Sequence, residues 1–360
     1  MDLDSLRDGV RDVLVREADA ARLHRFVDGD ALTDAGLWRT AADLGWPALA
    51  IPEAQGGLGL GIAESAVMLE ELGRALAPIP HLPTLLAARA IALAGSPAQQ
   101  DRWLPAIAAG ELTCAVTSPG PDARPTLTLR AEADALVLSG EAADLLQGAD
   151  ADLLVLLANE GDGAAYVVVE VKADGVELLV ERTVDRTRHL ARARFGGLRL
   201  PADRRLAGPA DTVREAILAE AALALACDAV GGANAIFERT LDYLKTREQF
   251  GKPIGSFQAL KHRCADHKVA LEASRAVVAE AVQLWGAGDP TSPMLASVAK
   301  AYACEVYARV AEDAVQLHGG IGFTWEHDCH LFLKRAKLDQ ALFGATAAHL
   351  DRAAGLLLEA

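Results

Sequence analysis

The chain has 360 residues, a formal net charge of −15, and 51% hydrophobic against 24% charged residues. This composition is typical of a soluble globular protein with two or three domains, and it excludes a disordered or fibrous chain. The excess of 50 acidic over 35 basic side chains argues against nonspecific binding to nucleic acid or to an anionic membrane, because both would repel it.

The first part of the chain, residues 1–112, is predicted to be a helical domain. Its apolar residues recur at helical spacing, and Ser96 is expected to cap a helix that begins at Pro97. The glycine-rich run from Gly56 to Gly61 follows a helical region, so a tight connection is favoured over a phosphate-binding loop. The acidic N-terminus lacks the pattern of a secretory signal, which indicates a cytoplasmic protein.

Residues 113–205 are predicted to form a small β-barrel or β-sandwich domain. Short runs of apolar and β-prone residues alternate here with Gly, Asp and Pro. The expected strands are Thr113–Thr117, Ala135–Leu138, Leu153–Leu157, Tyr166–Val171 and Val176–Val180.

Residues 206–360 return to long helical patterns and are predicted to form a four-helix bundle. The most apolar stretch, from Ile217 to Phe237, contains Glu220 and Asp228, so no membrane insertion is expected. The whole chain is therefore predicted to have an α+β fold that is mostly α: a helical domain, a small β domain and a helical bundle.

The sequence favours no metal site. The five cysteines are scattered without a C-x-x-C pair, so reduced thiols are expected. His327 and His330 form a His-x-x-His pair next to Cys329, but helical ligand pairs more often have i, i+4 spacing. A metal centre at this segment is the less favoured interpretation.

Two segments of the C-terminal part have side chains suited to a nucleotide. From Thr246 to Gln258 a helix gives way to a Gly/Pro loop and a second helix, and the segment offers a guanidinium, an aromatic ring and an amide. From Gln316 to Phe323 a helix stops at paired glycines, which let backbone N–H groups approach an anion. Each segment alone is also explained by a helix end that needs glycine.

Together these segments resemble the acyl-CoA dehydrogenase family. The resemblance covers nearly the whole chain and includes Ile51–Leu60, Arg247–Gln258 and Gln316–Phe323. It implies a flavoprotein that oxidises an acyl-CoA thioester to the 2,3-enoyl form: a glutamate removes the α-proton and FAD accepts the β-hydride. Electrons would then pass to an electron-transfer flavoprotein.

The resemblance also implies where FAD binds. In this family the flavin lies at a subunit interface, with its ring held by one subunit and its ADP half by the other. The positions of this chain that match the ADP-side contacts are Arg247, Phe250, Gln258, Gln316, Gly319 and Gly320.

Other positions depart from the family pattern. The signature T-E-P-x-x-G-S-D corresponds to Thr117–Ala123, which lacks its Glu and its Gly-Ser-Asp. The W-I-T loop that packs on the flavin ring aligns with Asp144–Leu146, which lacks both the aromatic ring and the hydroxyl group. Phe343 occupies the place of the usual catalytic glutamate, and a benzyl ring cannot abstract a proton.

An alternative catalytic base is Glu220. Some family members place the base on an earlier helix, at a position that matches Ala221 of this chain, and Glu220 is adjacent. One residue along a helix is a rotation of about 100 degrees, so Glu220 would face elsewhere unless the helix is shifted or bulged.

Three functions remain open. The pattern of retained and lost contacts resembles the small, base-lacking subunit of heterotetrameric steroid-CoA dehydrogenases, which would contribute the ADP-side residues to a flavin in a homologous chain. The first alternative is a self-sufficient homo-oligomeric dehydrogenase that uses Glu220 as its base. The second is a non-enzymatic scaffold or acyl-CoA-binding relative that binds no flavin.

Overall fold

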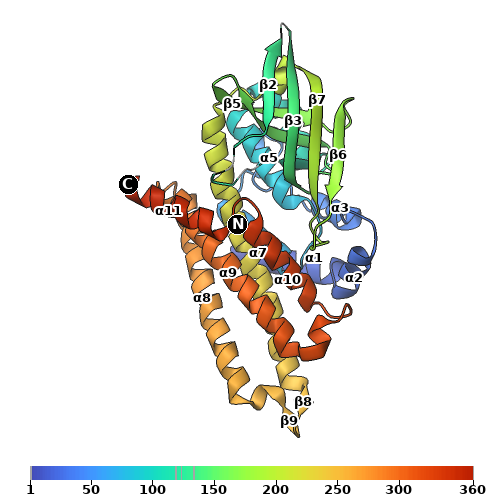
Figure 1. The fold of residues 1–360 in the computed structure, drawn as a ribbon, viewed down its shortest axis with the longest axis vertical. Coiled ribbons are helices and arrows are strands. Elements are labelled where there is room, and N and C mark those ends of the chain that lie inside the picture. The colour runs from blue at the N-terminus through green and yellow to red at the C-terminus, as the bar shows by residue number, and fades with distance from the viewer. Residues whose placement is uncertain (1, 118–119, 123, 133, 360) are drawn as a thin grey trace. The chain divides into compact units, whose positions relative to one another are not determined.

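The computed structural model describes residues 2–117, 120–122, 124–132 and 134–359 (Figure 1). It confirms the predicted α+β fold, since helices precede and follow a central sheet along the chain. The chain forms two units, each described here by itself. The first unit comprises Met1–Gly29, Ile62–Ala77 and Ala222–Ala360, and the second comprises Asp30–Gly61 and Pro78–Ala221.

The first unit is built from helices and one two-stranded hairpin. Its central helix is α9 (Ser292–His318), which packs along α8, α10 and α11, and Figure 1 shows α8 and α9 side by side. Alanines such as Ala299, Ala303 and Ala311 are buried along α9, and their small side chains permit close helix packing. The other elements are α1 (Leu3–Glu17), α2 (Ala20–Asp28), α4 (Ile62–Arg74), β8 (Glu248–Gln249), β9 (Lys252–Pro253), η3 (Ile254–Ser256), α8 (Gln258–Gly286), η4 (Gly319–Phe323), α10 (Cys329–Ala341) and α11 (Thr346–Glu359).

The second unit combines short helices with the sheet. Within it, α5 (His81–Ala94) is buried along most of its length and packs against β1 and β4. The predicted cap of α6 (Pro97–Ala108) is confirmed: the Ser96 hydroxyl accepts from the Gln99 N–H, and the Gln99 side chain accepts from the Ser96 N–H. The remaining helices are α3 (Ala35–Asp43), η1 (Glu53–Gln55) and η2 (Ala202–Arg204).

The sheet is mixed and has seven strands, in the order β1-β4-β2-β3-β7-β6, with β5 paired to β4. Strand β4 runs parallel to β1 and β2, and the other pairs are antiparallel. Leu154, Leu156, Val167 and Val169 are buried in its apolar core. The strands are β1 (Cys114–Val116), β2 (Leu127–Glu132), β3 (Ala135–Leu146), β4 (Leu153–Glu160), β5 (Gly163–Glu170), β6 (Val176–Glu181) and β7 (Leu190–Pro201).

Helix α7 (Ala210–Thr246) is the longest element and contributes to both units. It is long and apolar enough to cross a membrane, but 94% of its most apolar window is buried inside the structure. This is the pattern of a core helix in a soluble protein. Where α7 crosses α4, a Cβ atom at Gly231 would lie 1.9 Å from the Glu70 carbonyl oxygen, so the crossing requires glycine.

Candidate functional site

The first predicted nucleotide segment is a turn between α7 and α8. Helix α7 ends at Thr246, the β8–β9 hairpin and η3 follow, and Gln258 is the first residue of α8. Phe250 lies at the hairpin turn with a φ of 53° and is 91% exposed. A left-handed backbone is unusual for a phenylalanine. In this turn the ring is exposed to solvent rather than packed in the apolar core of the unit.

The second segment closes the C-terminal end of α9. The helix ends at His318, and Gly319 has a φ of 64°, which glycine adopts without strain. A Cβ atom at Gly320 would meet no atom within 4 Å, so the space beside this backbone is open. Gln316 is exposed on the last turn of the helix.

Tyr243 and His318 bring the two segments together, although they are 75 residues apart in the chain. Their rings stack with centroids 4.4 Å apart, and the Tyr243 hydroxyl donates to the His318 carbonyl oxygen at 3.3 Å. His318 is fixed in turn, because its Nδ1 donates to the Ala314 carbonyl oxygen at 2.8 Å. Tyr243 was not predicted from the sequence, since a tyrosine inside a helical pattern carries no signal of its own.

The chemistry of this end of the first unit fits the ADP half of FAD. All six predicted residues are exposed. The side chains of Arg247, Gln258 and Gln316 make no hydrogen bond or ion pair with any residue that the structure describes. A free guanidinium suits a diphosphate, free amides suit the polar edge of a nucleotide, and glycine backbone permits close approach.

His318, His327 and Cys329 form a polar cluster beside this end, in which His327 is half-buried and the other two are buried. One ligating atom each from His318, His327 and Cys329 lie within 4.8 Å of one another, and the Cys329 sulfur lies 3.3 Å from His318 Nδ1. Burial raises the pKa of the Cys329 thiol to about 12, so the thiol is protonated at neutral pH. His330 lies outside the cluster and stacks on Trp325, with centroids 4.7 Å apart. The contacts among His318, His327 and Cys329 connect the two ends of the segment that contains η4, and Gly319 and Gly320 lie on η4.

Phe343 lies in the loop between α10 and α11. Its ring is buried, and its backbone has a φ of 54°. Two buried side chains hold the loop: Lys300 Nζ donates to the Gly344 carbonyl oxygen at 2.6 Å, and His349 Nε2 donates to the Phe343 carbonyl oxygen at 3.0 Å. Because burying an amine is costly, a lysine with 0% exposure shows how strongly this loop is fixed.

Glu220 lies in the second unit and is 5% exposed. Its Oε2 accepts from Arg89 Nε of α5 at 3.1 Å. Burial raises the pKa of the Glu220 carboxyl, and Arg89 opposes this shift. The α-helix runs without interruption through Glu220 and Ala221, so the two side chains point about 100 degrees apart.

The ring-side positions lie in strand β3 and in the segment that follows β1. Residues 118, 119 and 123 of the Thr117–Ala123 signature lie outside the described residues. Asp144 is exposed at an irregularity of the β3–β7 pairing, whereas Leu145 and Leu146 are buried. The next residue, Gln147, was not predicted from the sequence. It is 1% exposed, and its amide has no hydrogen-bond partner among the described residues.

The glycine-rich run between η1 and α4 forms a tight connection. The N–H groups of Gly57, Leu58, Gly59 and Leu60 all donate to carbonyl oxygens of residues 48–52. A Cβ atom at Gly57 would lie 1.9 Å from the Ile51 carbonyl oxygen. Because these donors are used within the loop, they are not available to a phosphate.

Comparison with protein families gives two matches. The family described as acyl-CoA dehydrogenase, N-terminal domain, matches residues 2–111, and the acyl-CoA dehydrogenase, C-terminal domain, matches residues 211–357. The acyl-CoA dehydrogenase IpdE2 of Mycobacterium tuberculosis is 37% identical over 333 residues, which cover 92% of this chain and 89% of the relative.

Two solved structures extend the similarity to three dimensions. The ChsE4–ChsE5 complex of Mycobacterium tuberculosis contains a chain that matches with a TM-score of 0.93 and 28% identity, covering 99% of this chain and 97% of that one. A variant of the Tcur3481–Tcur3483 steroid ACAD matches with a TM-score of 0.91 and 32% identity, covering 99% and 98%.

Proposed function

Because the chain belongs to the acyl-CoA dehydrogenase family, we propose that it is the subunit of a heteromeric dehydrogenase that contributes the ADP-side FAD contacts and lacks the catalytic base. The observation that carries this proposal is the split between two sets of positions. All six ADP-side residues are exposed, and the side chains of Arg247, Gln258 and Gln316 have no polar partner among the described residues, which suits a shared site. The usual base position, in contrast, holds the buried Phe343.

The residues of this chain would bind and orient the cofactor. Arg247 would donate to phosphate oxygens, and Gln258 and Gln316 would hydrogen-bond polar edges of the ADP half. Phe250 would cover a flat ring of the cofactor, and Gly320, which has no side chain, would let the cofactor approach the backbone closely. When bound, FAD supplies the hydride acceptor. A homologous partner chain would supply the base that removes the α-proton, and electrons would leave to an electron-transfer flavoprotein.

The similar structures support a partner subunit. One is described as a ChsE4–ChsE5 complex, and the other names two chains of a steroid ACAD. We therefore propose a steroid-type acyl-CoA as the substrate class. From the N-terminal sequence, we also propose the cytoplasm as the compartment. Exposed apolar side chains at the FAD end, Phe250 at 91% and Phe323 at 84%, suit burial against another chain.

The test is FAD content with and without the partner. The chain is purified alone and after co-expression with a homologue that retains the T-E-P, W-I-T and glutamate features, and FAD per chain is measured from visible absorbance. We expect a colourless lone chain and about one FAD for each two chains in the complex. A yellow lone chain with one FAD per chain would show that the chain is self-sufficient.

A matched pair of variants tests the assigned contacts. Arg247→Ala removes a free guanidinium from the ADP side, and we expect the complex to retain less FAD through dialysis. Arg309→Ala removes an exposed arginine of α9 outside the predicted site and should retain FAD like the wild type. Equal retention in both variants would contradict the assignment, and a complex without flavin under any pairing would favour the scaffold.

The self-sufficient alternative is supported by one observation, the buried Glu220 carboxyl with its raised pKa, because such a group suits a general base. Its pairing with Arg89 is against it, since a base must be free to accept a proton. Glu220→Gln in the flavin-loaded complex should leave the turnover of acyl-CoA nearly unchanged if the partner supplies the base. A loss of at least 100-fold, with flavin content intact, would assign the base to Glu220.

A further inference from the structure

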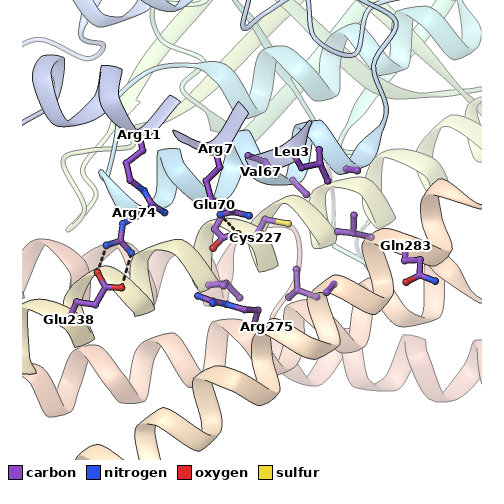
Figure 2. A pocket seen from close by; sticks show the side chains of 16 residues that line it. Leu3, Arg7, Arg11, Val67, Glu70, Arg74, Cys227, Glu238, Arg275 and Gln283 are labelled. Carbon is purple, nitrogen blue, oxygen red and sulfur yellow. Dashed lines mark hydrogen bonds and ion pairs between the residues drawn. The ribbon is translucent and has the colours of Figure 1, made fainter. Parts of the chain in front are cut away.

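A cavity in the first unit is separate from all the residues assigned above (Figure 2). Helices α1, α4, α7 and α8 line this cavity, which is open to solvent on one side and has a volume of about 780 Å³, within the range of small-molecule sites. No predicted FAD contact lines it, and neither do Glu220 and Phe343. The cavity therefore requires an explanation that does not depend on the proposed function.

The lining changes from apolar to charged along the helix axes. At one end lie Leu3 and Val67, and at the other lie Arg11 and the pair Arg74–Glu238 (Figure 2). Leu3 and Arg11 are eight residues apart on α1, which corresponds to about 12 Å of helix. The ligand that fits such a cavity is elongated and has one apolar end and one polar end.

Three of the four lining arginines already have carboxylate partners. Arg7 lies 2.9 Å from Glu70, Arg11 lies 2.7 Å from Glu71 on the adjacent position of α4, and Arg74 pairs with Glu238. These pairs use every lining carboxylate. Their charges cancel, so they leave no net charge for a ligand.

Arg275 of α8 is the fourth arginine, and it makes no hydrogen bond or ion pair with any part of the chain that the structure describes. Glu272, nearly one turn away on the same helix, interacts electrostatically with Arg275, but its carboxylate accepts its hydrogen bond from Lys268. Among the described residues, the cavity therefore has one exposed guanidinium that no carboxylate binds directly. Val278 and Val282 follow at intervals of three and four residues, so they share a face with Arg275.

We propose that this cavity binds an amphipathic organic monocarboxylate. Its carboxylate lies at Arg275, whose guanidinium can donate two parallel hydrogen bonds, and its apolar body lies against Val67, Val278 and Val282. One unpaired arginine matches one negative charge. A cationic ligand would be repelled by Arg275, and a neutral ligand would leave that guanidinium unpaired.

Calorimetric titration of the full chain tests the proposal with dodecanoate, below the concentration at which it forms micelles. Dodecanol, which has the same chain length and no charge, is the matched ligand. We expect dodecanoate to bind at least 10-fold more tightly than dodecanol, because a charge-assisted hydrogen bond is lost with the alcohol.

Three variants locate the binding. Arg275→Gln should lower the affinity for dodecanoate at least 10-fold and leave the affinity for dodecanol unchanged. Ala279→Trp places a ring into the cavity from an exposed, tolerant position and should abolish binding of both. Arg309→Gln is the control for the loss of an exposed arginine and should bind like the wild type.

Each other outcome would overturn the proposal. Absence of dodecanoate binding by the wild type excludes the ligand class. Unchanged affinity in both Arg275→Gln and Ala279→Trp places the binding elsewhere, for example in the acyl-CoA site. Weaker dodecanoate binding in Ala279→Trp but not in Arg275→Gln shows that the cavity binds the apolar chain and that Arg275 does not bind the carboxylate. A change of oligomeric state in Ala279→Trp, without dodecanoate binding by the wild type, shows that the cavity is a protein contact.

Discussion

Two buried histidines make the stability of this protein sensitive to acid. Burial lowers the pKa of His81 and of His349 to about 4, from an ordinary value of 6.5. Between these values the unfolded chain binds protons that the folded chain does not bind. Stability therefore falls as the pH decreases from 6.5 to 4, by about 3 kcal/mol for each histidine.

We expect His81→Leu to flatten this pH dependence, because the leucine side chain has no proton to bind. The free energy of unfolding, measured in urea at pH 7 and at pH 4.5, should decrease less in the variant than in the wild type. His262→Leu changes a histidine on α8 that is exposed, and it serves as the control. Equal pH dependence in all three proteins would show that His81 does not titrate as assigned.

At the scale of single residues, the sequence predicted six ADP-side positions but not their environment. Exposure of Phe250 depends on a left-handed backbone at the hairpin turn, and helical periodicity does not report this. The pairing of Glu220 with Arg89 joins two helices 131 residues apart. No local pattern encodes such a contact, because it depends on how the helices pack.

At the scale of elements, the chain pattern predicted five of the seven strands, and it missed β2 and β7. Both strands contain charged residues, which in the sequence alone are typical of a loop. In the sheet these charges pair across strands: Arg192 lies 2.8 Å from Glu181, and Arg199 lies 2.7 Å from Glu132. Cross-strand pairing of this kind stabilises an exposed sheet face, but it is visible only when the partner strand is known.

The crossing of α4 and α7 gives a prediction at this scale. Gly231→Ala forces a Cβ atom against the Glu70 carbonyl oxygen, and backbone atoms cannot move aside cheaply. We expect a loss of about 3 kcal/mol in the free energy of unfolding. Gly355→Ala on α11, where no atom lies within 4 Å, should be neutral or stabilising by up to about 1 kcal/mol. Similar stability of the two variants would contradict the close crossing.

At the scale of the whole molecule, the proposed division of labour between subunits makes stability depend on FAD. A ligand that binds only the folded complex stabilises it by about 2.7 kcal/mol at 100 times its dissociation constant. We expect excess FAD to raise the melting temperature of the complex and to leave that of the lone chain unchanged. Calorimetric scans with and without FAD measure both. A comparable rise for the lone chain would favour the self-sufficient enzyme.

The sequence by itself determined the order of helical and β segments, the Ser96 cap and the family, because these depend on periodicity and on motifs within a few residues of one another. Only the tertiary structure showed that Tyr243 and His318 join the two predicted nucleotide segments and that Lys300 and His349 hold the Phe343 loop. Only it showed that Arg275 lines a cavity and has no hydrogen bond or ion pair among the described residues. These contacts connect residues distant in the chain, and their existence depends on the packing of whole helices rather than on local preference.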